Sequence, residues 1–157
     1  LWRETVQDIE KSYPEVDVSY EFVDAVAMRL VQWPNCYDVL ITENLFGDIL
    51  TDEASVISGS MGLMPSASIG TKNALYEPIH GSFPQAAGLG IANPLATILS
   101  VAMMFEMSFN MKQEGGVIRN AVNYSLEEGK VTQDLTQKGA KSLSTSEVGD
   151  YLVELIK

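Results

Sequence analysis

Two acidic residues, Asp48 and Asp52, lie four positions apart in a stretch that is otherwise mostly apolar or small, TENLFGDILTDEASVISGSMG, which begins at Thr42. The apolar residues around them predict a helix over about 45–57. Side chains four apart on a helix face the same way, so the two carboxylates repel one another unless a cation lies between them. Mg²⁺ and Mn²⁺ prefer such hard oxygen ligands. The spacing therefore permits a divalent-metal site, although from spacing alone a solvated acidic face is the favoured interpretation.

Two further features could belong to a ligand site. Asp24 follows a predicted strand, at the end where open α/β sheets bind ligands, although it could instead be the N-cap of the next helix. His80 is the only histidine and begins the glycine-containing loop HGSFPQAAGLGIANP. This loop has no G-x-G-x-x-G and no P-loop pattern, and a lone loop histidine is most often structural. Residue types alone give this loop only weak support as a nucleotide site.

Alternating strands and helices are expected to position these residues. Residues 16–23 and 37–42 predict buried strands on either side of a helix that Pro34 ends, which is a βαβ unit with parallel pairing. Residues 59–72 are rich in Gly, Ser and Pro and predict an irregular segment, followed by a strand at 74–79. The fold class predicted is α/β.

Further helices are predicted where apolar periodicity and end signals coincide. They are expected at residues 1–12, from Pro94 to Phe109, over 115–129, and after Ser144, where Ser144 and Glu147 fit a capping box.

Composition excludes several classes of function. The 10 basic and 21 acidic residues give a formal net charge of −11, which leaves no basic surface for nucleic acid. The single cysteine, Cys36, allows no internal disulfide and indicates a reducing cytoplasm. No apolar run reaches the length of a membrane span, and no signal peptide is present. The chain starts at Leu1 inside a helical pattern, so we expect it to begin within a longer protein.

Four motifs in order carry a family resemblance: TENLFGDILTDEAS, SGSMGLMPSAS, LYEPIHGS and GIANPLATILSVAMM. Together they resemble the β-decarboxylating dehydrogenases, the family of isocitrate and isopropylmalate dehydrogenases. The resemblance covers essentially all 157 residues but only the C-terminal half of the family's chain. It implies part of a two-domain α/β fold with two incomplete sheets. Residues 1–58 would belong to the subunit-interface domain, which holds metal and substrate, and residues 59–157 to the cofactor domain.

The resemblance also implies an activity. Members of the family carry out a nicotinamide-dependent oxidative decarboxylation. The motifs SGSMGLMPSAS and ENLFGDIL favour members that act on 3-isopropylmalate in leucine biosynthesis, over members acting on isocitrate, homoisocitrate or tartrate. Asp48 and Asp52 match the acids that hold Mg²⁺ or Mn²⁺ against the substrate. Asp24 matches the acid that reaches the same metal from the other subunit of a homodimer.

The resemblance assigns seven residues to the NAD site: Glu77, His80, Gly81, Ser82, Phe83, Gln85 and Asn93. Of these, His80 packs on the adenine, Asn93 bonds to its edge, and Glu77 lies near the nicotinamide half. Gln85 is a departure, because NAD-specific members usually carry Asp there, where it binds the adenosine ribose hydroxyls. Discrimination between NAD and NADP is therefore expected to be weaker.

The resemblance places the family's catalytic lysine, acid–base tyrosine and substrate-binding arginines upstream of Leu1. The chain by itself is therefore expected to be inactive. The alternatives to a dehydrogenase are a non-catalytic regulatory or association subunit, and an α/β domain without a small-molecule site. Regulatory relatives tend to lose metal-binding acids, whereas Asp24, Asp48 and Asp52 are all present.

Overall fold

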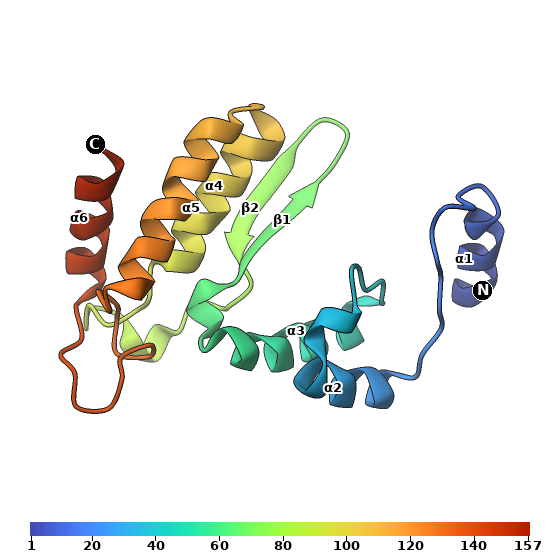
Figure 1. The fold of residues 1–157 in the computed structure, drawn as a ribbon, viewed down its shortest axis with the longest axis horizontal. Helices are drawn as coiled ribbons and strands as arrows, with labels where there is room; N and C mark the ends of the chain where they lie inside the picture. The colour runs from blue at the N-terminus through green and yellow to red at the C-terminus, as the bar shows by residue number, and fades with distance from the viewer. The chain divides into compact units, whose positions relative to one another are not determined.

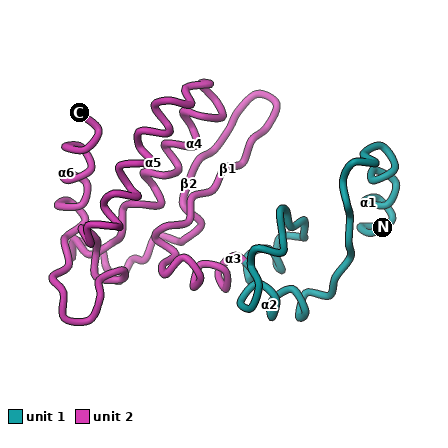
Figure 2. Tube along the Cα trace, viewed as in Figure 1, with its two compact units in different colours: residues 1–50 teal, residues 51–157 magenta.

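The computed structural model describes all 157 residues and contains helices and one two-stranded sheet (Figure 1). The chain divides into two compact units, residues 1–50 and 51–157 (Figure 2). The boundary falls within helix α3 (Asn44–Ser58), so this helix contributes to both units. None of the helices is long and apolar enough to cross a membrane.

Unit 1 contains α1 (Trp2–Glu10), α2 (Val23–Gln32), the 3₁₀ turn η1 (Pro34–Cys36) and the first half of α3. Helix α2 ends where expected, because Pro34 forces the preceding Trp33 out of helical geometry, to φ −145° and ψ 64°. The buried core of unit 1 consists of Val26, Leu30 and Leu50, with Val23, Ala27 and Tyr37 packed against it. This core is small, and it fastens α2 to the start of α3.

The predicted βαβ unit in residues 16–42 is wrong. Neither 16–23 nor 37–42 forms a strand, and no backbone hydrogen bond joins the two segments. A strand needs a neighbour for its ladder, and two strands without a third are at best marginal. The apolar residues that suggested a buried strand are exposed instead, with Val39 79% and Ile41 70% exposed.

The sheet of unit 2 is an antiparallel hairpin of β1 (Pro65–Ile69) and β2 (Ala74–Pro78). Strand β2 was predicted, but β1 falls in the stretch expected to be irregular, so that prediction is wrong there. The chain reverses between Gly70 and Asn73, where the Gly70 N–H donates to the Asn73 carbonyl at 2.9 Å. The turn gives each residue of β1 a partner in β2, which outweighs the low strand propensity of Ser, Ala and Pro.

The rest of unit 2 is helical and carries the main core. It contains the 3₁₀ turns η2 (Met61–Leu63) and η3 (Pro84–Ala86) and the helices α4 (Leu95–Ser108), α5 (Lys112–Glu127) and α6 (Thr145–Ile156). Helix α4 contacts both strands and α5, and α6 contacts α5 (Figure 1). The core residues are Leu95, Ala121, Val122, Val148 and Leu152. Full burial of a leucine such as Leu95 or Leu152 contributes about 1.5–3 kcal/mol.

All six predicted helices form, with ends shifted by a few residues at most. The capping box is confirmed: the Ser144 hydroxyl accepts from the Glu147 N–H at 3.3 Å, and the Glu147 carboxylate accepts from the Ser144 N–H at 2.7 Å. Helices α4 and α5 are joined by a two-point ion pair between Glu106 and Arg119, at 2.7 and 2.8 Å. Gly115 lies under it, where an added Cβ would come within 2.5 Å of Glu106 Cγ.

Candidate functional site

Asp48 and Asp52 lie one turn apart on α3, as the sequence predicts. The helix begins where it does because the Glu43 carboxylate accepts hydrogen bonds from two backbone N–H groups of the first turn, at 3.1 and 3.2 Å. The side chain of Asn44 donates to Asp48 Oδ2 at 3.0 Å. The Asp48 carboxylate is thus held by the preceding turn, and both acids remain exposed to solvent.

This pair fits a hard divalent cation. Mg²⁺ typically takes one or two protein carboxylates and completes its shell with water and substrate. Asp48 and Asp52 supply two such carboxylates on adjacent turns of one rigid helix. No group of three or more His, Cys, Asp or Glu side chains within this chain is arranged to hold a metal ion.

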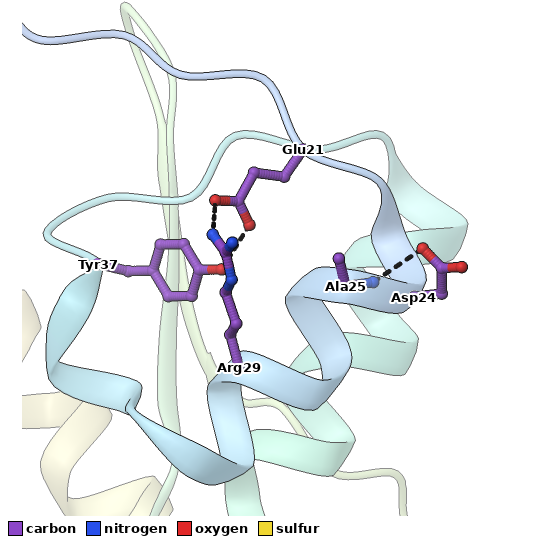
Figure 3. Close-up of polar contacts among 5 residues, drawn as sticks. All are labelled: Glu21, Asp24, Ala25, Arg29 and Tyr37. Carbon is purple, nitrogen blue, oxygen red and sulfur yellow. Dashed lines mark hydrogen bonds and ion pairs between the residues drawn. The ribbon is translucent and has the colours of Figure 1, made fainter.

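Asp24 is the second residue of α2, and its Oδ1 accepts from the backbone N–H of Ala25 at 2.8 Å (Figure 3). It is not the N-cap, the alternative that the sequence left open, because Phe22 occupies that position without a side-chain cap. Its negative charge stabilises the helix N-terminus, where backbone N–H groups point outward. Asp24 is exposed, so its carboxylate is accessible for a further ligand.

The predicted cofactor loop connects β2 to α4 and is fastened to the start of α6. Thr145, the first residue of α6, makes two hydrogen bonds to this loop. Its N–H donates to the Gly90 carbonyl at 2.8 Å, and its hydroxyl donates to the Ala92 carbonyl at 2.6 Å. At the other end of the loop, Phe83 adopts a left-handed conformation with φ 43°, which is uncommon for a bulky residue. Backbone of this kind is held in place only by its surroundings and is frequent at ligand sites.

An open groove of about 460 Å³ lies along this loop. It is lined by Ser82, Phe83, Ala86, Ala87, Gly88, Gly90, Ala92 and Thr145. Two of the predicted cofactor residues, Ser82 and Phe83, therefore line a recess. Its wall is largely small side chains and backbone, which allows close approach of a flat ligand.

His80 carries a polar atom that has no partner in the protein. Its Nδ1 lies 2.9 Å from the Gly81 carbonyl, whereas its Nε2 is buried and makes no hydrogen bond. Leaving a buried polar atom unpaired costs about 1–3 kcal/mol. A ligand group that hydrogen-bonds to His80 Nε2 would offset that cost, so the residue fits a place in a cofactor site.

The remaining predicted cofactor residues lie on three different elements. Glu77 is exposed on β2, opposite Ser66 of β1. Gln85 is exposed in η3, next to the loop glycines. Asn93 comes directly before Pro94, the N-cap of α4, and its Oδ1 accepts from the first-turn N–H of Leu95 at 3.0 Å. The structure thus groups residues 80–85 on one loop, with Glu77 on the preceding hairpin.

Asn93 also belongs to a hydrogen-bonded cluster that the sequence did not reveal. Its Nδ2 donates to Asp134 Oδ2 at 2.9 Å. The same carboxylate accepts from the Ser60 hydroxyl, and from the Thr132 hydroxyl at 2.5 Å. Asp134 therefore joins three loops that are far apart in the chain. Gly62 lies directly against Asn93, because an added Cβ would come within 2.6 Å of its side chain.

The pKa of Asp134 lies below its ordinary value. Burial by itself would raise it, but hydrogen bonds from Ser60, Thr132 and Asn93 to the ionised carboxylate outweigh that effect. The only sequence signal for this cluster is the Thr-x-Asp spacing of Thr132 and Asp134 in a loop, a pattern typical of local turn bonding. That pattern does not identify the distant partners, Ser60 and Asn93.

We expect Asp134→Asn to lower the free energy of unfolding at pH 7 by about 1–2 kcal/mol. Hydrogen bonds to a charged group can contribute more than this, but Asp134 is partly exposed, and water weakens their contribution. A carboxyl group whose pKa is lower in the folded protein than in the unfolded chain stabilises the fold at pH values above its unfolded pKa. This contribution is lost as the pH falls through the pKa of the folded protein. The difference from the natural protein should therefore shrink below pH 3.8, the ordinary value.

Urea unfolding of the complete protein at pH 7 and at progressively lower pH measures this difference. Asp150→Asn is the matched control, since Asp150 is an exposed carboxylate on α6 that makes no hydrogen bond. Equal destabilisation by the two variants would contradict a stabilising role for Asp134.

Comparison with known proteins agrees with the fold and with the placement of the motifs. The family described as isocitrate/isopropylmalate dehydrogenase matches residues 1–152. A 3-isopropylmalate dehydrogenase of Bacteroides fragilis is 55% identical over 157 residues, and one of Pseudomonas putida is 50% identical over 158 residues. Each of these alignments covers 100% of this chain but only 44% of the relative.

Solved structures show the same relationship. An isocitrate dehydrogenase from Methylococcus capsulatus superposes with a TM-score of 0.91 at 40% identity, covering 98% of this chain and 44% of that structure. A β-decarboxylating dehydrogenase from Thermococcus kodakarensis, solved in its apo form, gives a TM-score of 0.81 at 37% identity, covering 98% of this chain and 44% of that structure.

The fold and the full-length match define the class of protein. The chain belongs to the isocitrate/isopropylmalate dehydrogenase family and has part of its α/β fold, so the predicted family and fold class are confirmed. The expectation of two incomplete sheets is corrected to one two-stranded sheet, because residues 16–23 and 37–42 form no strand. It spans less than half the length of the curated relatives it matches. The two curated relatives, 55% and 50% identical to it, are each named 3-isopropylmalate dehydrogenase.

Proposed function

We propose that the complete protein containing this chain is an NAD-dependent 3-isopropylmalate dehydrogenase. It oxidises 3-isopropylmalate and releases CO₂, giving 4-methyl-2-oxopentanoate in leucine biosynthesis. The observation that carries this proposal is the 50–55% identity over the whole chain to relatives named for that reaction. The acids on α3 and the loop around His80 support it, because they provide ligand groups of the kinds that this reaction requires.

In this proposal Asp48 and Asp52 hold Mg²⁺ or Mn²⁺, and Asp24 reaches the same ion from the second subunit of a homodimer. When bound, the ion supplies Lewis-acid stabilisation of negative charge on the substrate oxygens. The task of the protein is to keep the carboxylates in place. Asn44 does so for Asp48 through its 3.0 Å hydrogen bond, and Glu43 does so by fixing the first turn of α3.

The loop residues bind and orient the dinucleotide. Gly81, Ser82 and Phe83 provide backbone that can approach it closely, and His80 packs on the adenine with Nε2 available for a partner. Asn93 is oriented for the adenine edge by its hydrogen bonds to Asp134 and from the Leu95 N–H. Residues 1–58 are proposed to belong to the interface domain and residues 59–157 to the cofactor domain, in a cytoplasmic enzyme.

We expect Gln85→Asp in the complete protein to raise the preference for NAD over NADP about tenfold or more. A carboxylate at this exposed position of η3 can accept from both ribose hydroxyls and repels a 2′-phosphate, whereas Gln85 does not repel it. Bonds of this type contribute roughly 1–3 kcal/mol. Steady-state kcat/KM for the two cofactors measures the ratio, and an unchanged ratio would contradict this assignment of Gln85.

The function itself is tested by assaying the complete protein with Mg²⁺ and NAD on 3-isopropylmalate, isocitrate, homoisocitrate and tartrate. The proposal requires the highest kcat/KM for 3-isopropylmalate. Isocitrate is the second candidate substrate, because a structure titled isocitrate dehydrogenase matches the fold with a TM-score of 0.91. Turnover of none of the four acids would favour a regulatory or association subunit.

A further inference from the structure

A cluster of three polar side chains in unit 1, Glu21, Arg29 and Tyr37, has no place in the proposed reaction. Arg29 Nη1 donates to Glu21 Oε1, and the Tyr37 hydroxyl donates to Glu21 Oε2 at 2.7 Å (Figure 3). Both oxygens of one carboxylate are therefore engaged by groups from different parts of the chain. We call these three residues the Glu21 cluster.

The Glu21 cluster holds the backbone that enters α2. Glu21 precedes the N-cap residue Phe22, and Arg29 lies about two turns along the same helix. Tyr37 follows η1 and packs against the core of unit 1. The arrangement is a polar counterpart of the hydrophobic staple, in which the residue before the N-cap contacts a residue within the helix and sets the direction of entry.

The tether adds to the support of the first turn of α2, where Val23 packs against the core of unit 1 but Phe22 provides no side-chain cap. Because no side chain caps the first N–H groups of α2, a contact that holds the entering chain opposes fraying at this end of the helix. Asp24 lies in that first turn, and its carboxylate bonds only to the adjacent N–H of Ala25. The Glu21 side chain is 20% exposed, so its charge is partly withdrawn from water and depends on its two partners.

We propose that Glu21, held by Arg29 and Tyr37, is a positioning residue for Asp24: it fixes the first turn of α2 and so directs the Asp24 carboxylate toward a divalent cation. This inference rests on the proposed function, which makes Asp24 a metal ligand. Val26 and Leu30 of α2 pack with Leu50 of α3 and keep α2 in place when the tether is cut. Loss of the tether should therefore affect metal binding more than stability.

The test uses the complete protein, with Mn²⁺ affinity measured by electron paramagnetic resonance in the presence of 3-isopropylmalate, alongside thermal melting. Glu21→Met removes both contacts, Arg29→Met and Tyr37→Phe remove one each, and Arg29→Lys retains the charge. Asp24→Asn reports the effect of losing the ligand itself. Asp8→Asn is the matched control, because it breaks an ion pair of the same unit, to Lys11 at 2.7 Å, away from α2.

We expect Glu21→Met to weaken Mn²⁺ binding about threefold to tenfold, less than the roughly 10–100-fold typical of losing a direct partner of a metal ligand. Arg29→Met and Tyr37→Phe should weaken it less, and Arg29→Lys least. All four should melt close to Asp8→Asn. If Glu21→Met fails to fold, the two single-contact variants decide the outcome in the same direction.

A result that contradicts the positioning role of Glu21 can be distinguished from one that contradicts the proposed function. If Asp24→Asn weakens Mn²⁺ binding but no cluster variant differs from Asp8→Asn, the positioning role is wrong and the proposed function stands. A cluster variant that melts early yet binds Mn²⁺ normally also overturns it, since the cluster would then serve stability alone. If Asp24→Asn itself binds Mn²⁺ normally, the assignment of Asp24 as a ligand fails, and the inference fails with it.

Discussion

Asp48→Asn in the complete protein is expected to lower the turnover number about 10²–10³-fold while leaving the fold intact. A bound metal contributes several kcal/mol of charge stabilisation, and each 1.36 kcal/mol is a factor of ten in rate. Asparagine has the shape of aspartate, so it can still accept the hydrogen bond from Asn44, and Glu43 still caps α3. The variant loses one ligand charge with little change of structure.

The comparison variant is Glu53→Gln, which makes the same change from carboxylate to amide on the same helix, one position beyond Asp52. Turnover should be measured over a range of Mg²⁺ and Mn²⁺ concentrations, with melting curves to verify folding. Asp48→Asn should need more metal and remain slow at saturation. If it turned over as fast as Glu53→Gln, Asp48 would not be a metal ligand.

Residues 1–157 alone are expected to show no dehydrogenase activity. The acids on α3 can hold a metal against a hydroxyl group, but the family resemblance places the lysine and tyrosine that exchange its proton outside these residues. General acid–base help contributes about 10²–10⁴-fold, and the loss of groups that position the substrate costs more. We do not expect His80 to replace them, since it lies on the predicted cofactor loop rather than on α3.

The measurement is NAD⁺ reduction by the purified 157-residue chain with 3-isopropylmalate and Mg²⁺, beside the complete protein at equal concentration. The complete protein should turn over, and the chain should give the background rate. A rate near that of the complete protein would contradict the expectation. Activity of the chain that disappeared on His80→Ala would show that the base lies on the cofactor loop.

Local interactions explain why the helices could be predicted. The apolar periodicity of α3 and α5, the proline that ends α2 and the capping box of Ser144 and Glu147 all act within a few residues. Local helix geometry also explains why Asp48 and Asp52 lie on one side of α3, because four residues make about one turn. These features depend little on the rest of the molecule.

Strand predictions were less successful, because a strand exists only when a partner is adjacent. Residues 16–23 and 37–42 have strand-like composition but find no strand partner and form no strand, and Val23 instead begins α2. Residues 65–69 have poor strand composition but are paired by the turn at 70–73. Pairing in each case was decided by the surroundings and not by propensity.

By itself the sequence determined the family, through four ordered motifs, and it determined the helices and the identity of the candidate ligands. Only the tertiary structure showed that Asp134 joins Ser60 to Asn93, that Glu21 is held by Arg29 and Tyr37, and that His80 Nε2 lacks a partner. The physical reason is sequence separation. A helix or a cap forms from neighbours in the chain, whereas a carboxylate that joins residues 60, 93 and 134 depends on how the whole unit packs.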